Sequence, residues 1–290
     1  MGTGSYFHSW SAAPVTLTNK LTVKLPVVLI HAFCDVPELT GTLKLAERSL
    51  RDMGVEYFST AIPIHRTGGT IATRTRELVS QIQEKYHNRQ IHLFGHSMGG
   101  LNARDIAARS SEENGFTVVT VTTFGTPHRG VKALGTTSML NRISTATAFM
   151  TLKTIIPGIQ DLTCDSMSIF NQRVLDNPTV RYFSWAGYTD LPTLWTATSA
   201  YGDTDSLVNV DSAEWGTHLG TIQGLDHHAI INKRTVTATL PHLAAAEGGQ
   251  LATVQLVENN LLSAVANVTE GVANNLLAPT RALMAKFKHI

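Results

Sequence analysis

The sequence is poor in cysteine, and this shortage excludes several kinds of protein. Two cysteines occur among 290 residues, Cys34 and Cys164, and no Cys-x-x-Cys pair is present. Two thiols are too few for a disulfide framework, and without such a pair we expect neither a zinc site nor a thioredoxin-type redox site. Cys34 follows a strongly apolar run, so we expect it to be buried and unreactive.

Charge of one sign and long apolar runs are also missing. Charged residues make up 16% of the chain, the formal net charge is +1, and acids and bases are intermixed. Without a basic stripe or an acidic tail we expect no nucleic-acid partner, and without an uninterrupted run of about 18 apolar residues we expect no membrane span. The first residues lack a basic segment followed by an apolar one, which favours an intracellular protein. A secreted chain with its signal removed would have the same sequence.

Hydrophobic residues, by contrast, make up 43% of the sequence. This is enough for one large core, and we expect residues 1–290 to form a single domain. Short β-branched apolar runs predict strands at 25–30, 55–60, 91–94, 118–124 and 180–186, with a last one near Ile222 and Leu225. Helical spacing of apolar residues predicts helices at 39–53, 71–86 and about 98–110. The alternation predicts an α/β fold whose mostly parallel sheet has helices on both faces.

The string Gly95-His96-Ser97-Met98-Gly99 has the form G-x-S-x-G and lies between an expected strand and an expected helix. In this setting it predicts a nucleophile elbow, a turn so tight that the serine takes strained backbone angles. The Ser97 hydroxyl would then lie at the carboxyl edge of the sheet, where free N–H groups of the helix favour a developing oxyanion. Ser97 is therefore the candidate nucleophile, against the alternative of an ordinary serine in a glycine-rich turn.

A nucleophilic serine needs a base, and the base needs an orienting acid. In this fold both follow the serine, first the acid and then the histidine. Of the 12 histidines, His227 and His228 stand near the expected last strand. The acids ahead of them are Asp203, Asp205 and Asp211, and composition leaves all of these alternatives open.

Several ordered strings extend the pattern over residues 25–235: PVVLIHAF, GHSMGGLNAR, FGTPHRG, QDLTCDSMSIFN, VRYFSWAG, TDSLV, SAEWG and LDHHAIIN. With them the chain resembles the true lipases of the Pseudomonas and Burkholderia type and the related fungal triacylglycerol lipases. The resemblance implies an α/β-hydrolase fold with a helical lid and a serine carboxylic ester hydrolase, most directly a triacylglycerol lipase acting through an acyl-enzyme. Short-chain carboxylesterase, thioesterase and phospholipase activities are alternatives on the same triad. A non-catalytic binding protein of this fold is the competing class.

The resemblance also chooses among the open candidates for acid and base. The string Thr204-Asp205-Ser206-Leu207-Val208 matches the N-D-G-L-V string of these lipases, which implies Asp205 as the acid. Their histidine string maps the base to His227. Asp203 and His228 are the second choices.

The oxyanion hole that the resemblance implies combines the backbone N–H groups of Met98 and Phe33. Similar lipases carry His-Gly-Leu where this chain has His31-Ala32-Phe33. Glycine at such a turn often serves a positive φ or a close backbone approach. Alanine at position 32 is therefore a departure that puts the geometry of this loop in question.

The resemblance implies no metal and no cofactor. The bacterial relatives hold a structural calcium partly through an aspartate two residues after the catalytic histidine, where this chain has Ala229. An alanine side chain cannot ligate a hard cation that requires oxygen. We therefore expect no calcium at that position.

Two regions lie outside the expected sheet. Residues 131–170 are weakly charged, and the resembling lipases have a lid there, so we expect a lid that covers an acyl-binding cleft and contacts a lipid surface transiently. A packed helical cap is the alternative. The string HLAAAEGGQ at 242–250 predicts a hinge before a helical C-terminal extension, 251–290, which we expect to pack on the sheet or on a partner subunit. Contact of this extension with a membrane surface is the alternative. The expected partner is a lipid ester substrate, and the oligomeric state stays open.

Overall fold

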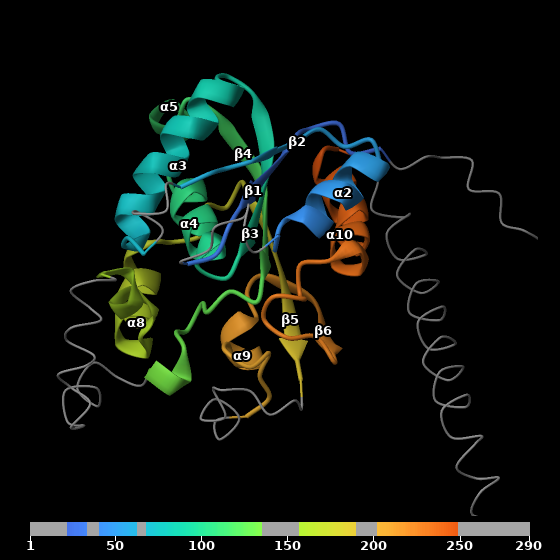
Figure 1. Cartoon of the computed structure of the whole chain (residues 1–290). Coiled ribbons are helices and arrows are strands. Elements are labelled where there is room, and N and C mark those ends of the chain that lie inside the picture. The colour runs from blue at the N-terminus through green and yellow to red at the C-terminus, as the bar shows by residue number, and fades with distance from the viewer. Residues whose placement is uncertain (1–21, 34–40, 63–67, 135–156, 190–201, 249–290) are drawn as a thin grey trace, which may run out of the picture.

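A computed structural model describes residues 22–33, 41–62, 68–134, 157–189 and 202–248 (Figure 1). In these ranges six strands form one sheet in the order β2-β1-β3-β4-β5-β6. Every neighbouring pair is parallel. The strands are β1 (Val27–Ile30), β2 (Tyr57–Ser59), β3 (Gln90–His96), β4 (Thr117–Phe124), β5 (Arg181–Tyr188) and β6 (Thr217–Gln223). The predicted α/β class with its parallel sheet is confirmed.

Helices connect the strands and cover both faces of the sheet. They are α2 (Lys44–Asp52), α3 (Ile71–Tyr86), α4 (Met98–Ala107), α5 (Ser111–Asn114), α8 (Cys164–Arg173), α9 (Val210–Ala213) and α10 (Lys233–Ala246), with the 3-10 turns η2 (Lys132–Leu134) and η3 (Pro157–Leu162). Figure 1 shows α3 and α4 on one side of the sheet and α2 and α10 on the other. The strand order explains this arrangement, because the chain passes from β1 to β2 in one direction along the sheet and from β2 to β6 in the other. Right-handed crossovers in opposite directions place their helices on opposite faces.

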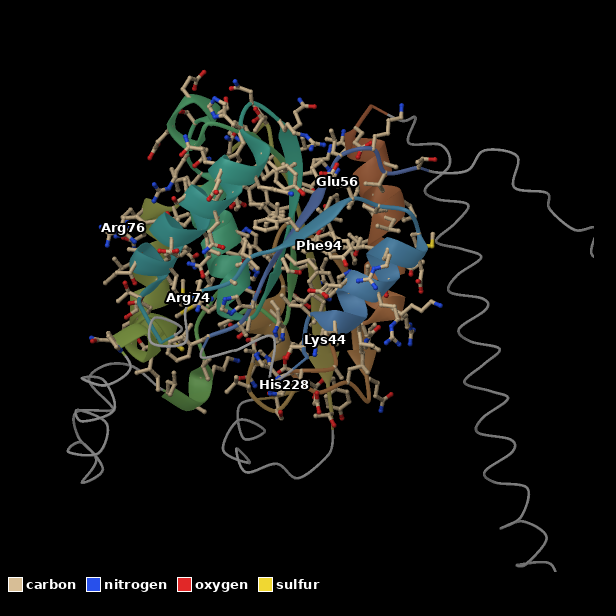
Figure 2. The ribbon with its side chains drawn as sticks, turned by 45° about the horizontal axis from the view of Figure 1, so that its top comes forward. Lys44, Glu56, Arg74, Arg76, Phe94 and His228 are labelled. Atoms are coloured by element: carbon tan, nitrogen blue, oxygen red, sulfur yellow. The ribbon has the colours of Figure 1, made fainter. Side chains whose placement is uncertain are left out.

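Both faces of the sheet are apolar, so each binds its helices by hydrophobic burial. On one face Leu78 of α3 packs in a cluster with Ile91 of β3. On the other face Leu243 of α10 packs with Phe94 and Phe124, whose rings meet edge to face at 5.3 Å between centroids. Figure 2 shows Phe94 in the interior, between the helical layers. Strands buried on both sides explain why the strand segments read as nearly continuous hydrophobic runs.

Two helix predictions show how far local sequence signals reach. The helix predicted at 71–86 has those bounds, and the Thr70 side chain caps its first turn. The helix predicted at 98–110 is shorter and ends at Ala107. Ser110 caps the separate short helix α5 with its side chain, since serine favours N-caps over helix interiors.

The predictions near the carboxyl-terminal end of the sheet need correction. The last strand begins earlier than predicted, because β6 covers Thr217–Gln223 and leaves Leu225 beyond it. The hinge predicted at 242–250 is wrong for the described residues up to Ala246, which form the end of α10. Alanine has the highest helix propensity, and Leu243 is fully buried. The helix therefore continues until shortly before Gly248, which has a φ of 98°.

Some predictions fall on residues outside the described ranges. These are the middle of the lid insertion at 135–156, the extension from residue 249 onward, and Cys34. The division into one domain with a lid and an extension therefore stays a prediction. Within the described ranges, no helix combines the length and the apolar character needed to cross a membrane.

A buried carboxylate ties both ends of the described chain to the amino edge of the sheet. The Glu247 side chain, 8% exposed, accepts hydrogen bonds from the backbone N–H groups of Lys24 and Leu25 and from Nε2 of His92. Nδ1 of His92 lies 2.9 Å from the Thr120 hydroxyl. Burial alone would raise the pKa of the Glu247 carboxyl, but these hydrogen bonds outweigh it and hold the pKa below its usual value.

We expect Glu247→Gln to lower the free energy of unfolding at neutral pH by about 1–3 kcal/mol, because the variant loses a charged acceptor that two backbone N–H groups and the buried ring of His92 share. A carboxyl with a depressed folded-state pKa stabilises the fold above its unfolded-state pKa, and this contribution is lost as pH falls through the folded-state value. The gap between variant and wild type should therefore narrow below about pH 4. Denaturant unfolding at a series of pH values measures both effects.

The matched control is Glu112→Gln in α5, since Glu112 is exposed and its loss should leave stability unchanged. Equal stability of Glu247→Gln and wild type at neutral pH would contradict the role of this carboxylate.

Candidate active site

β3 passes into α4 through a single residue, Ser97. This residue has a φ of 54° and a ψ of −127°, a region that non-glycine residues rarely adopt and that costs about 1–3 kcal/mol. Its N–H donates to the carbonyl of Phe124 in β4 at 3.0 Å. Its side chain makes no N-cap hydrogen bond to α4, so the hydroxyl is not used to satisfy that helix end. The strained turn is the geometry that the G-x-S-x-G string predicts.

Three glycines let the backbone segments around this turn approach one another closely. A Cβ on Gly95 would overlap the backbone of Gly100, and a Cβ on Gly99 would overlap the carbonyl of Ile30 in β1. A Cβ on Gly100 would overlap the side chain of Thr126. The glycines thus allow α4 to start directly against the neighbouring strand and loop.

A histidine and a carboxylate meet beside this turn. Nδ1 of His227 lies 2.8 Å from Oδ2 of Asp205, and the two residues are 5% and 1% exposed. The other carboxylate oxygen, Oδ1, accepts the N–H groups of Leu207 and Val208 at 3.0 and 2.7 Å. Since a carboxylate can only accept, Nδ1 of a neutral His227 carries the proton and Nε2 is the basic nitrogen. Nε2 is buried and has no hydrogen-bond partner among the described residues.

Two further glycines leave room for this pair. Gly125, at the end of β4, has a φ of 56°, and a Cβ there would lie 2.9 Å from Oδ2 of Asp205 and 3.3 Å from Nδ1 of His227. Gly187 in β5 is as tight, since its Cβ would lie 3.1 Å from Cβ of Asp205. The carboxyl ends of β4 and β5 therefore form the floor beneath the acid and the base.

The alternative acids and base lie elsewhere. Asp211 pairs with Lys132 at 2.7 Å, and Asp203 is exposed. His228 is exposed as well, with its ring centroid 6.0 Å from that of His227. Figure 2 shows His228 at the opposite end of the molecule from Glu56, which precedes β2.

The loop after β1 is fixed by a buried arginine from α3. Nη2 of Arg74 donates to the carbonyls of His31 and Ala32 at 2.8 and 3.2 Å, and Nε donates to the side chain of Asn102 at 3.1 Å. Arg74 is only 1% exposed. Its contacts turn two carbonyls of the loop toward α3 and so fix the orientation of the peptide between Ala32 and Phe33.

Alanine is compatible with this loop. The non-glycine residues with positive φ in the described ranges are Asn88, Ser97 and Ser206. Ala32 is not among them, so its backbone does not adopt the conformation that would require glycine at this position. Phe33 is half-buried and packs against the cluster that includes Met98. The two residues expected to supply oxyanion donors therefore lie in one apolar neighbourhood.

Among the residues that the structure describes, no group of three or more His, Cys, Asp or Glu side chains is arranged to hold a metal ion. Ala229 is part of a turn that begins at Asp226. Asp226 accepts hydrogen bonds from the N–H groups of His228 and Ala229 at 3.0 and 2.8 Å. This turn holds the segment that carries His227.

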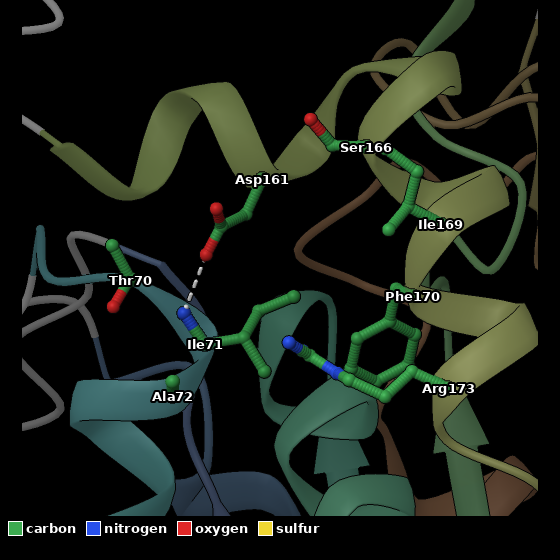
Figure 3. Close-up of a pocket in the computed structure, with 8 residues that line it drawn as sticks. All are labelled: Thr70, Ile71, Ala72, Asp161, Ser166, Ile169, Phe170 and Arg173. Carbon is green, nitrogen blue, oxygen red and sulfur yellow. Dashed lines mark hydrogen bonds between the residues drawn. The ribbon is translucent and has the colours of Figure 1, made fainter.

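A cavity of about 350 Å³ opens beside α3. Apolar Ile71, Ile169 and Phe170 line it together with charged Asp161 and Arg173, as Figure 3 shows. Asp161 accepts the N–H of Ile71 at 2.7 Å and so caps α3, and burial raises the pKa of its carboxyl. Ile71 and Phe170 belong to the apolar cluster that contains Met98, so this cavity borders the packing around the start of α4.

Three residues at the site escaped the sequence reasoning. Arg74 lies on the apolar stripe of its helix between Ile71 and Leu78, and a cation in such a stripe is a signal for a buried polar contact. His96 occupies a position that the elbow motif leaves open. Gly125 gave no local signal, because its close neighbours come from distant loops.

The solved structure of a mature lipase from Bacillus licheniformis is similar to this chain with a TM-score of 0.60. The sequence identity is 20%, and the match covers 76% of this chain and 92% of that one. Identity this low shows the fold, and the fold is that of the α/β hydrolases.

The chain belongs to the palmitoyl protein thioesterase family, whose profile matches residues 26–194, more than half of the sequence. Triacylglycerol lipase 2 of Saccharomyces cerevisiae is 26% identical over 200 residues, which are 64% of this chain and 60% of the yeast protein. The triacylglycerol lipase of Burkholderia plantarii is 29% identical over 126 residues, 41% of this chain and 34% of that protein. The chain therefore spans at most 60% of the length of these two relatives. The resemblance to lipases inferred from the sequence is confirmed at the level of the family.

We expect Gly125→Ala to lower the turnover of any reaction that uses Ser97 by about 10–100-fold, because its Cβ pushes Asp205 and His227 apart and small displacements of catalytic groups are costly. The matched control is Gly224→Ala. Gly224 has a φ of 83° with nothing within 4 Å of its Cβ position, so this variant carries the same backbone strain without the clash. Labelling of Ser97 by a fluorophosphonate measures the effect, and equal labelling rates in both variants would refute it.

We expect Arg74→Met to reduce kcat by about 10–100-fold with a smaller change in KM, because the loop after β1, which carries the expected oxyanion donor Phe33, loses the side chain that orients it. Arg76→Met is the control on the same helix, since Arg76 is exposed and lies at the outer edge of the molecule in Figure 2, whereas Arg74 lies nearer the sheet. Steady-state kinetics normalised to folded protein decides the question. If both variants keep wild-type kcat, Arg74 has no part in the reaction.

Proposed function

We propose that the protein is a serine-dependent hydrolase of carboxylic esters in which Ser97 is the nucleophile, His227 the base and Asp205 the acid. One observation carries the proposal: the Asp205 carboxylate holds Nδ1 of a buried His227 at 2.8 Å and leaves Nε2 without a described partner. A histidine in this tautomer is ready to take a proton from a serine hydroxyl.

The proposed reaction has two halves. Ser97 Oγ attacks the acyl carbonyl carbon while Nε2 of His227 takes its proton, and the imidazolium then protonates the departing alcohol as the ester C–O bond breaks. Water attacks the resulting acyl-serine and gives its proton to His227, which returns it to Ser97 Oγ as the acid leaves. Asp205 orients the ring and stabilises its cation throughout. The sum is ester plus water to carboxylic acid plus alcohol.

The tetrahedral oxyanion formed in each half needs fixed donors. We assign this role to the N–H groups of Met98 and Phe33. Met98 begins α4, where the first N–H groups have no partner within the helix and the helix dipole favours negative charge. Phe33 follows the two carbonyls that Arg74 holds. Loss of one such donor typically costs about 10²–10³ in turnover.

We assign triacylglycerols as the substrate class, as the names of the yeast and Burkholderia relatives favour. An acyl chain needs apolar surroundings, and a buried apolar cluster of Met98, Ile71, Leu162 and Phe170 packs next to the proposed nucleophile. The cavity of Figure 3, which borders this cluster, adds room for an acyl chain.

We further propose that the insertion at 131–170 acts as a lid that contacts a lipid surface. Its stem, residues 131 and 162, supports this, because the N–H of Val131 donates to the carbonyl of Leu162 at 2.8 Å and these two positions therefore lie side by side. The helix after the stem is held to the core. Arg104 donates to the side chain of Asn171 at 2.9 Å and lies over the ring of Trp215 at 3.6 Å from its centroid.

A second candidate function is thioester hydrolysis on the same triad. The family match to palmitoyl protein thioesterases favours it specifically. The acyl half of a palmitoyl thioester and of a long-chain ester is the same, and the two substrates differ in the leaving group.

We expect the wild type to hydrolyse nitrophenyl esters, an emulsified triacylglycerol and a palmitoyl-cysteine peptide at different rates, and Ser97→Ala to lose about 10⁴–10⁶-fold on all of them. The order of rates across the panel distinguishes lipase, short-chain esterase and thioesterase.

Ser184→Ala is the matched control. Ser184 is a buried serine of β5 whose hydroxyl lies 3.0 Å from Nδ1 of His218, so it is a second serine–histidine pair, outside the proposed reaction. This variant should keep its rate per folded molecule. A wild type that is silent on every ester and thioester, or a Ser97→Ala variant as active as wild type, would overturn the proposal in favour of a non-catalytic binding protein.

A further inference from the structure

The histidine next to the candidate nucleophile is bonded to the backbone of the candidate base. Nε2 of His96 lies 2.7 Å from the carbonyl oxygen of His227. Since a carbonyl only accepts, Nε2 of His96 carries the proton and donates it. The two rings also pack together, with centroids 5.0 Å apart and planes inclined by 39°.

With this bond, both the N–H and the carbonyl of His227 are hydrogen-bonded to residues of other segments. The N–H of His227 donates to the carbonyl of Asp205 at 2.8 Å, and the carbonyl of His227 accepts from His96. One contact fixes the proposed base to the loop that carries the proposed acid, and the other fixes it to the end of β3, next to Ser97. The peptide groups on both sides of His227 are thus positioned by Asp205 and by His96, the neighbour of Ser97.

His96 is suited to this task because it does not gain a charge near neutral pH. It is fully buried, and burial, helped by the neighbouring imidazole of His227, lowers its pKa to about 3. A neutral neighbour adds no repulsion when His227 becomes a cation. The groups that face His96 electrostatically are the histidines His31, His227 and His228.

We infer that His96 is a positioning residue of the proposed reaction, whose Nε2–H fixes the backbone of His227 so that its ring stays aligned between Asp205 and Ser97. The inference rests on the proposed function. It gives a role to the first variable position of the G-x-S-x-G string, through the hydrogen bond between His96 and the carbonyl of His227, which is 131 residues away in the sequence.

The test compares three substitutions at one position. In His96→Gln the side-chain amide nitrogen lies the same number of bonds from the backbone as Nε2 and can replace the donor. In His96→Asn the amide is too short, and His96→Leu has no donor. We expect Leu and Asn to lower kcat and the rate of Ser97 labelling by about 10–100-fold with KM within about threefold. We expect Gln to recover to within about fivefold of wild type.

His92→Leu is the matched control, because His92 is a fully buried histidine on the same strand whose bonds go to Glu247 and Thr120. It should lower Tm and leave kcat per labelled site unchanged. If the role of His96 were purely structural, its substitutions would lower Tm in the same way, but His96→Gln and His96→Asn would not differ in kcat. If His96→Leu does not fold, the comparison of kcat between His96→Gln and His96→Asn still tests the positioning role.

A second readout does not depend on turnover. The far-downfield NMR resonance of the His227 Nδ1–H, expected from its bond to Asp205, should broaden in His96→Asn and persist in His96→Gln. Retention of wild-type kcat and of a sharp resonance in His96→Asn overturns the positioning role while the hydrolase stands. A wild type without activity or labelling overturns the hydrolase, and the inference with it.

Discussion

The turn at Ser97 is the constraint around which the rest of the site is organised. A non-glycine residue with a φ of 54° is retained only where the surrounding structure holds it. Here that hold comes from β4, which accepts the Ser97 N–H, and from glycines that bring α4 against β1. The same close approach places the first turn of α4 beside the loop that follows β1. One strained residue thus sets the relative positions of the candidate nucleophile and the candidate oxyanion donors.

Buried polar side chains do the rest of the positioning. Arg74, His96 and Asp205 are each almost fully buried. Arg74 and His96 donate to backbone carbonyls of distant segments, the loop after β1 and His227, whereas Asp205 accepts from N–H groups of its own turn and from the ring of His227. Burying such groups is costly unless their hydrogen bonds are made. These bonds therefore specify one arrangement of the loops, since any slip would leave a buried charge or carbonyl without a partner.

The two edges of the sheet have separate tasks. At the carboxyl edge the segments after β1, β3, β4, β5 and β6 gather the candidate catalytic groups, as is general for parallel sheets. At the amino edge Glu247 and His92 join the ends of the described chain to the strands. The contacts of Glu247 and the candidate catalytic groups thus lie at opposite ends of the same strands. A substitution that lowers stability at the amino edge should therefore disturb the geometry of the candidate site only slightly.

Local sequence by itself determined the strands of the sheet, the helices α2, α3 and α4 and the elbow, but it gave no prediction for α8, α9 or α10. Apolar periodicity located α3 to the residue, and the G-x-S-x-G string with its flanking pattern singled out Ser97, because both depend on neighbours a few positions away. The acid and base needed a family resemblance, since several aspartates and histidines satisfy the same order. Only the tertiary structure brought Gly125 against Asp205, Arg74 against Ala32, and His96 against His227. These contacts join residues 42 to 131 positions apart, and they exist only because parallel strands collect distant loops at one edge of the sheet.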